Sequence, residues 1–152
     1  MKNTIKVLTD LKWNLDCLKT KMPKDYVPKT TYTDKTANGL TKCIVDWINL
    51  NGHQAERIST TGRYIDNSKV VTDILGRTKK IGGGKYIKGS GTKGSADISA
   101  TIKGKSIKIE VKIGADRQSE HQKEYQQKIE QAGGVYFIAK DFDSFIEFYN
   151  KI

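Results

Sequence analysis

Hydrophobic and polar residues alternate in two adjacent runs of the chain, separated by Lys103-Gly104. Alternation with period two is typical of β-strands that bury one face. A glycine in a two-residue connection permits the positive φ that a tight turn requires. The pattern therefore predicts a β-hairpin. Its apolar face carries Ile98, Ala100 and Ile102 in the first strand and Ile107, Ile109, Val111 and Ile113 in the second.

The opposite face of this hairpin carries three charged residues, Asp97, Glu110 and Lys112. A two-residue loop places Asp97 opposite Glu110, and a four-residue loop places it opposite Lys112. A shift by one residue would turn Asp97 towards the isoleucines, so the hydrophobic pattern excludes that register. Both remaining registers bring the three side chains together, because directly opposed Cβ atoms lie about 5 Å apart.

The hydrophobic pattern also predicts the elements on either side of the hairpin. In chain order these are a helix over 4–22, a polar connector over 23–35, a helix over 36–51, a strand over 54–59, a strand over 70–75 that pairs near Tyr64, a helix from Ser119, a strand over 135–139 and a last helix capped by Asp141 or Asp143. A strand, a helix and a strand within about thirty residues imply a parallel crossover. We expect an α/β fold, with an N-terminal helix and connector over 1–35 and one main domain over 36–152.

The first predicted helix carries an apolar stripe with alternating spacings of three and four residues. Two interpretations of this stripe stay open. It packs on its own domain, or it forms the contact of a homodimer. The stripe consists of Leu8, Leu11, Leu15, Leu18 and Met22.

The chain is strongly basic, with 27 Lys and Arg against 17 Asp and Glu in 152 residues, a net charge of +10. This excess favours a polyanionic partner, nucleic acid first and an anionic membrane surface or acidic protein second. No apolar run of about 18 residues and no signal-peptide pattern occurs, so we expect a cytoplasmic protein without a membrane partner. Cys17 and Cys43 are predicted to be reduced, buried thiols on helices.

The tract over 77–93 is rich in glycine and contains no acidic residue. Glycine lets backbone N–H groups and lysines approach phosphates closely, so we expect a flexible loop that contacts nucleic acid. Arg63, beside the Thr60-Thr61-Gly62 turn, is a further candidate for a phosphate contact. The complete set of nucleic-acid-binding candidates is Arg63, Arg77, Lys79, Lys80, Lys85, Lys88 and Lys93.

Two carboxylates beside a lysine are suited to a divalent metal, because the carboxylates repel each other unless a cation lies between them. Hard oxygen ligands favour Mg²⁺ or Mn²⁺. The amine of Lys112 can then hold an attacking water or stabilise negative charge on a phosphate. The alternative is an exposed hairpin in which Asp97, Glu110 and Lys112 form only a surface ion pair.

At these residues the chain resembles the PD-(D/E)XK nuclease superfamily, and within it the VRR-NUC group. The resemblance covers about residues 37 to 149. One departure is Ala96, where the family often has proline. The matching segments are Gly94-Ser95-Ala96-Asp97, Ile109-Glu110-Val111-Lys112, Ser119 with Gln122, and Gly133-Gly134-Val135-Tyr136.

The resemblance implies a restriction-endonuclease-like mixed sheet with an α-β-β-β-α-β core and a Mg²⁺- or Mn²⁺-dependent endonuclease. Its catalytic residues would be Asp97, Glu110, Lys112 and Gln122, and its metal ligands Asp97, Glu110 and the Val111 carbonyl. It further implies DNA as substrate, structure-specific cleavage of branched, flap or junction DNA, and a stand-alone nuclease of the kind often associated with phages.

Two features leave the functional assignment open. Gln122 follows Ser119 in the spacing of a helix capping box, so its role is either capping or contact with the acidic face of the hairpin. The helix over 36–51 contains no glutamate, although the superfamily often places one there, and Asn38 is the nearest candidate by spacing. We therefore keep an alternative, a nucleic-acid-binding protein on a nuclease-like fold with weak or absent catalysis.

Overall fold

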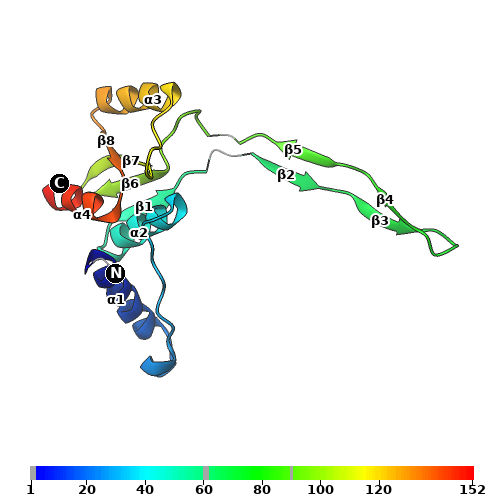
Figure 1. Ribbon diagram of the computed structural model, residues 1–152, viewed down its shortest axis with the longest axis horizontal. Helices are drawn as coiled ribbons and strands as arrows, with labels where there is room; N and C mark the ends of the chain where they lie inside the picture. Colours follow the sequence, from blue (N-terminus) through cyan, green and yellow to red (C-terminus); the bar gives the residue numbers. More distant parts are fainter. Residues whose placement is uncertain (1–2, 60–61, 90) are drawn as a thin grey trace. The chain divides into compact units, whose positions relative to one another are not determined.

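The computed structural model describes residues 3–59, 62–89 and 91–152. Contacts divide the chain into two compact units. The core unit comprises Met1–Ile58 and Gly94–Ile152, and the ribbon unit comprises Ser59–Lys93. Both units are drawn in Figure 1. The expected domain boundary at residue 35 does not coincide with this division and stays a prediction.

The core unit contains a four-stranded mixed sheet in the order β1-β6-β7-β8. β1 pairs with β6, and β6 with β7, in antiparallel fashion, whereas β7 and β8 are parallel. The parallel pair confirms the predicted crossover through α3. The strands are β1 (Gln54–Arg57), β6 (Ile98–Ile102), β7 (Lys105–Val111) and β8 (Val135–Ala139).

The β6–β7 hairpin adopts the register of the two-residue loop, with Ile98 opposite Ile109. Lys103 and Gly104 have φ values of 49° and 79°, as a type I′ turn requires. This register excludes the four-residue loop. It places Asp97, one residue before β6, level with Glu110.

Helices cover both faces of the sheet. α2 and α4 pack on the isoleucine face, and the first turn of α3 reaches Glu110 on the opposite face. In Figure 1, α3 lies on one side of the strands and α2 on the other. The helices are α1 (Asn3–Lys19), η1 (Lys24–Tyr26, 3₁₀), α2 (Ala37–Leu50), α3 (Glu120–Gln131) and α4 (Phe142–Lys151).

The two predicted helix caps are present: Ser119 caps α3, and Asp141 rather than Asp143 caps α4. Thr36 caps α2 in the same way. In each case the side-chain oxygen accepts a hydrogen bond from a backbone N–H in the first turn, which would otherwise lack a partner. Gly52 follows the end of α2 with a φ of 78°, a conformation that glycine adopts readily after a helix.

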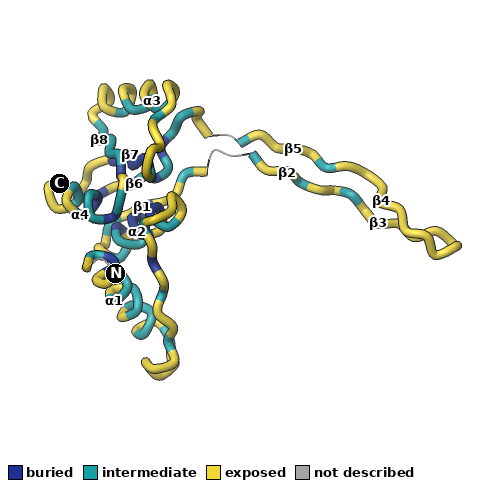
Figure 2. The backbone as a smooth tube through the Cα atoms, in the orientation of Figure 1, coloured by how far each residue is buried: buried dark blue, intermediate teal, exposed yellow. Residues whose placement is uncertain are grey.

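The hydrophobic core lies between the sheet and the helices α1, α2 and α4. Buried positions gather along β6, β7 and α2, as Figure 2 shows. Cys43 is among them, and its burial raises the pKa of the thiol to about 11. Cys17 is only half-buried, so the prediction of a buried thiol is wrong for that residue. The fully buried aliphatic and aromatic side chains are Leu8, Leu40, Ile44, Ile48, Ile98, Ile102, Ile107, Ile109, Phe142 and Phe145.

Within the core unit, α1 packs on α2 and α4 through a shorter apolar stripe than expected. Ile5 and Leu8 are buried against the core, but three members of the predicted stripe are exposed. The predicted helix also ends at Lys19 rather than at residue 22, before the polar connector begins. Trp13, in the middle of α1, donates a hydrogen bond to the Val27 carbonyl of the connector at 3.0 Å. The exposed members are Leu11, Leu18 and Met22.

The ribbon unit is a two-stranded antiparallel ribbon in which β2 pairs with β5 and β3 with β4. Two expectations are therefore wrong: the strand near residue 70 does not pair with the segment around Tyr64, and the tract over 77–93 contains strands. Glycine supports these strands, because a Cβ at Gly84 would lie 1.9 Å from the Tyr64 ring. The strands are β2 (Arg63–Asp66), β3 (Lys69–Thr72), β4 (Thr78–Ile81) and β5 (Gly84–Ile87).

The protein therefore belongs to the mixed α/β class. Within the residues that the structure describes, every helix is too short or too polar to cross a lipid bilayer.

Candidate active site

Asp97 is held at the open end of the β6–β7 hairpin by the backbone of both neighbouring strands. Its carboxylate Oδ2 accepts a hydrogen bond from the Val111 N–H at 2.9 Å. Its carbonyl accepts one from the Ile58 N–H at 2.8 Å. Oδ1 has no hydrogen-bond partner among the described residues, so this oxygen is available to a ligand.

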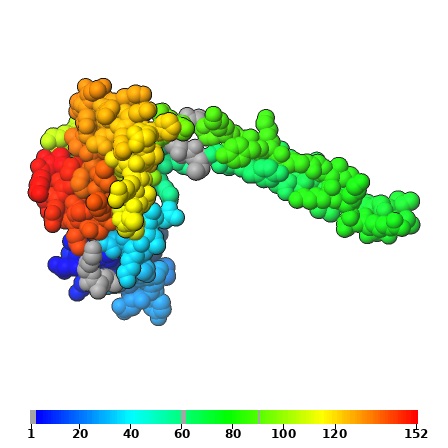
Figure 3. Space-filling view, turned by 45° about the horizontal axis from the view of Figure 1, so that its top comes forward, coloured from blue at the N-terminus to red at the C-terminus, as the bar shows by residue number. Residues whose placement is uncertain are grey.

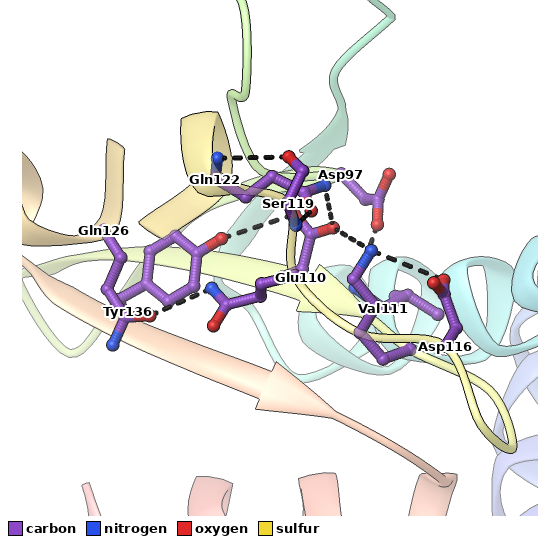
Figure 4. Close-up of polar contacts among 10 residues, drawn as sticks. Asp97, Glu110, Val111, Asp116, Ser119, Gln122, Gln126 and Tyr136 are labelled. Atoms are coloured by element: carbon purple, nitrogen blue, oxygen red, sulfur yellow. Dashed lines mark hydrogen bonds and ion pairs between the residues drawn. The ribbon is translucent and has the colours of Figure 1, made fainter. Parts of the chain in front are cut away.

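Glu110 lies on the face of β7 that α3 covers, and only 1% of its surface is exposed. Its Oε1 accepts a hydrogen bond from the Gln122 amide and lies 3.2 Å from the Lys112 ammonium. Its Oε2 accepts a hydrogen bond from the Tyr136 hydroxyl at 3.3 Å. Figure 4 shows the side chains of Gln122 and Tyr136 directed at the Glu110 carboxylate. The alternative of an exposed ion pair is therefore wrong, because the acid is buried.

Lys112 directly follows β7 and links Glu110 to the loop after the strand. Its ammonium lies 3.3 Å from Asp116 Oδ2, and 9% of the residue is exposed. Its backbone N–H donates to the Ala139 carbonyl of β8 at 2.9 Å. The backbone is thus fixed by the sheet, and the amine is held between two carboxylates.

The electrostatics of the site follow from burial and from the two neighbouring acids. Burial raises the pKa of Glu110, and the negative charge of Asp97 raises it further, while Lys112 and Tyr136 partly oppose the shift. Burial alone would lower the pKa of Lys112, but Glu110 and Asp116 outweigh it and raise that pKa. The site therefore holds a protonated amine beside a carboxylate whose charged form is disfavoured.

Gln122 performs both of the roles that its sequence position left open. Its side-chain oxygen accepts a hydrogen bond from the Ser119 N–H at 2.9 Å, which completes the capping box of α3. Its side-chain nitrogen donates to Glu110. The same amide therefore starts the helix and orients the buried acid. Gln122 is only half-buried, since none of the described residues of α3 is buried.

Two residues of the site were not predicted, Tyr136 and Asp116. Tyr136 belongs to the Gly-Gly-Val-Tyr segment of the resemblance, and the parallel register pairs it with Lys108, two residues before Glu110. Side chains two apart in a strand share a face, so the register would have placed Tyr136 with Glu110. Asp116 lies four residues after Lys112 in a loop, where sequence periodicity gives no signal.

The donor set fits Mg²⁺ or Mn²⁺. Asp97, Glu110 and the Val111 carbonyl would supply three hard oxygen donors, and Mg²⁺ usually keeps several water ligands. The unpartnered Oδ1 of Asp97 and the disfavoured charge of Glu110 both suit a cation between them. Among the described residues, no three or more His, Cys, Asp or Glu side chains cluster as metal ligands, so the set depends on the backbone oxygen.

A pocket beside Lys112 is lined mainly by cations. Four basic side chains surround it, against one carboxylate, and Ile138 forms part of its wall. An electropositive pocket next to the candidate metal ligands is suited to a phosphate group. Its charged and amide lining residues are Lys112, Asp116, Arg117, Gln118, Lys123 and Lys140.

The remaining predicted residues lie elsewhere. All seven nucleic-acid-binding candidates belong to the ribbon unit, while Thr60 and Thr61, beside Arg63, lie outside the described residues. Lys80 forms an ion pair with Asp66 at 2.8 Å. Asn38, the helical candidate for a further ligand, accepts a hydrogen bond from Arg57 at 2.8 Å.

No protein-family model matches the chain, and a search of curated proteins found no match either.

Proposed function

We propose that the protein hydrolyses phosphodiester bonds of DNA with Mg²⁺ or Mn²⁺ as cofactor. The observation that carries this proposal is the burial of Glu110 beside Asp97 and Lys112. A buried acid next to a second acid is unfavourable for folding. A catalytic metal site gives a functional reason for this arrangement, and perturbed carboxylates cluster at such sites.

Each residue of the site has a role that follows from its contacts. Asp97, Glu110 and the Val111 carbonyl would hold the ion, whose chemistry when bound is polarisation of the phosphate and activation of a water. Lys112 lines the cationic pocket, so its ammonium donates to a phosphate oxygen or holds the attacking water. Gln122 keeps Glu110 in place through its hydrogen bond.

The fold supports membership of the PD-(D/E)XK superfamily as part of the proposal. The elements that carry the site follow the chain order α2-β1-β6-β7-α3-β8. This order corresponds to the α-β-β-β-α-β core that the resemblance implies, with the ribbon unit inserted between β1 and β6. By the same resemblance we propose branched, flap or junction DNA as substrate.

A cleavage assay tests the proposal. Labelled duplex, single-stranded, flap and four-way-junction DNA are incubated with the protein in Mg²⁺, Mn²⁺ or EDTA. We expect metal-dependent cutting that falls by about 100-fold or more in Lys112→Ala, because the variant loses a charge at the reacting phosphate. Lys108→Ala is the matched control, since Lys108 lies in β7, four residues before Lys112, and donates to Ser99 instead.

Two outcomes of this assay would contradict the proposal. The first is equal cutting by the parent protein and Lys112→Ala, which would place the activity elsewhere or in a contaminant. The second is DNA binding without cutting in any metal.

The second outcome would favour the other candidate function, a nucleic-acid-binding protein without catalysis. Two observations support that candidate: α2 contains no glutamate, and its Asn38 accepts a hydrogen bond from Arg57. Calorimetric titration with Mn²⁺ separates the two candidates. Binding that Asp97→Asn abolishes supports the nuclease, and absence of any binding supports the alternative.

A further inference from the structure

The tip of the ribbon unit presents two apolar side chains to solvent. Ile74 is 103% exposed and Leu75 is 70% exposed. Both lie between β3 and β4, at the end of the ribbon where the chain reverses. Isolated exposed apolar residues are common. An adjacent exposed pair at the end of a basic ribbon instead indicates an interaction site.

The turn that carries this pair is held by its own backbone and by Asp73. The Asp73 N–H donates to the Arg77 carbonyl at 2.9 Å, and the Gly76 N–H donates to the Asp73 carbonyl at 3.0 Å. The Asp73 carboxylate accepts from the N–H groups of Leu75 at 2.9 Å and Arg77 at 2.8 Å. Gly76 supplies the positive φ, 75°. None of these contacts uses the side chain of Ile74 or Leu75. The turn therefore exposes both side chains to solvent but does not depend on them for its own stability.

The ribbon behind the tip is basic. The ribbon unit contains eight basic and two acidic residues. Asp66 pairs with Lys80, and the Asp73 carboxylate is occupied by backbone N–H groups. The register places Lys69 and Lys79 together on the face of the distal ribbon opposite to Lys80. An excess of positive charge therefore lies behind the apolar tip.

We propose that the tip inserts Ile74 and Leu75 as a wedge between neighbouring base pairs of double-stranded DNA, while the lysines behind the tip contact phosphates. Apolar wedges of Ile and Leu unstack a base step and kink the duplex, and a two-stranded ribbon is narrow enough to enter a groove. The proposal rests on DNA as the partner in the proposed function, but not on catalysis.

DNA explains the spread of charge better than a membrane surface does. From Arg77 to Lys85 the ribbon advances about 27 Å at about 3.4 Å per residue. The headgroup layer of a bilayer is only about 5–8 Å thick, so with the tip inserted most of these lysines would lie beyond it. Phosphates along a groove recur over the whole length of the ribbon.

The test uses duplexes, nicked and intact, that carry 2-aminopurine at successive positions and a dye at each end, in EDTA to prevent cleavage. Fluorescence of 2-aminopurine rises when the base loses its stacking, and energy transfer between the dyes reports bending. We expect both signals with the parent protein. The double variant Ile74→Ser/Leu75→Ser should lose them while its Kd for DNA weakens by no more than about tenfold.

Val70→Ser is the matched control, because Val70 is 69% exposed on the same ribbon but away from the tip. It should keep both signals. Figure 3 shows the side chains of the ribbon, in green, in contact with solvent, so neither change removes core packing.

Three results would overturn the inference. They are unchanged signals in the double variant, absence of both signals when the parent protein binds DNA, and a tip-dependent affinity for anionic vesicles without an effect on DNA. Cleavage of the same duplexes by the parent protein is measured separately in Mg²⁺. Cleavage without unstacking contradicts the wedge and leaves the nuclease in place, whereas unstacking without cleavage contradicts the nuclease and leaves the wedge in place.

Discussion

Replacing Gln122 by glutamate separates the two roles that this side chain combines. Glutamate suits the third helical position of a capping box, so its carboxylate can still accept from the Ser119 N–H. It has no donor for Glu110 at neutral pH. Ser119→Ala is the complementary change, since it removes the cap and leaves the Gln122 to Glu110 hydrogen bond in place.

The expected loss of stability follows from the contacts of Gln122. A hydrogen bond to a charged group contributes about 1.5–3 kcal/mol, and its loss leaves Glu110 facing a second carboxylate. The added negative charge at the start of α3 recovers about 0.3–1 kcal/mol. We therefore expect Gln122→Glu to lower the free energy of unfolding by about 2 kcal/mol at pH 7. Ser119→Ala should cost about 1 kcal/mol.

The two variants should also differ in pH dependence. Burial and Asp97 already raise the pKa of Glu110, and a carboxylate at position 122 would raise it further. The pKa of Glu110 is about 4.3 in the unfolded chain and higher in the folded protein. Folding is therefore penalised wherever the pH is high enough to charge Glu110 in the folded protein. This penalty disappears as the pH falls through the folded-state pKa, because a protonated acid can donate to its neighbour. The deficit of Gln122→Glu should shrink from pH 7 towards pH 5.

Urea unfolding of the metal-free protein in EDTA, followed by tryptophan fluorescence between pH 5 and pH 8, measures these differences. The deficit of Ser119→Ala should stay constant over the same range, since the cap does not titrate. A Gln122→Glu deficit that is smaller than that of Ser119→Ala, or independent of pH, would refute the contact with Glu110.

Two further predictions concern the packing of the core unit. Gly94→Ala should lower the melting temperature well below that of Gly52→Ala, because both glycines have a positive φ but only at Gly94 would a Cβ meet backbone, the His121 carbonyl oxygen at 2.3 Å. Equal melting temperatures would contradict the contact between Gly94 and the first turn of α3. Leu8→Ala should reduce the free energy of unfolding by about 3 kcal/mol, whereas Leu18→Ala on the same helix should change it by less than about 0.5 kcal/mol. Similar effects of both changes in urea unfolding would mean that α1 does not pack as described.

The core unit was largely predictable because its signals are local. Strict alternation fixed the faces of β6 and β7, and the glycine of the Lys103-Gly104 turn favoured the loop that the structure contains. The helix cap at Ser119 was predictable for the same reason, since a capping side chain bonds within its own turn.

The ribbon unit was harder to predict because exposed strands carry no burial pattern. A strand over 70–75 was predicted from its composition, but β3 and β4 are exposed at every residue, so no buried face indicates how they pair. Charge and glycine content favoured a loop over 77–93, and the turn at Asp73 that closes the ribbon was not predicted. An aspartate three residues before a glycine was the available signal, because aspartate favours the first position of a type I turn.

The site shows the same division between local and tertiary information. The sequence placed Asp97, Glu110 and Lys112 on one face, but whether that face was solvated depended on α3, whose own residues are mostly polar. Only the return of the chain through α3 to β8 brings Gln122 and Tyr136 onto Glu110. Whether Glu110 is buried or belongs to a surface ion pair therefore depends on the β7-α3-β8 crossover. The alternating pattern along the β6–β7 hairpin contains no information about that crossover.

The covering of Glu110 by α3 also accounts for the combination of a rigid buried acid and an amine at the wall of a pocket. Both oxygens of Glu110 have partners, and only 1% of the residue is exposed. The partners come from α3, from β8 and from the residue after β7, so the position of Glu110 is fixed before any ligand binds. Lys112, two residues later, lines the pocket where the cations converge. Groups that are already fixed in place stabilise charge that develops during the reaction without having to reorganise. Such an arrangement requires a buried residue that holds the groups in position and a neighbouring pocket that the substrate can enter. The end of β7 meets this requirement because α3 covers Glu110 while the loop after β7 leaves the pocket at Lys112 open.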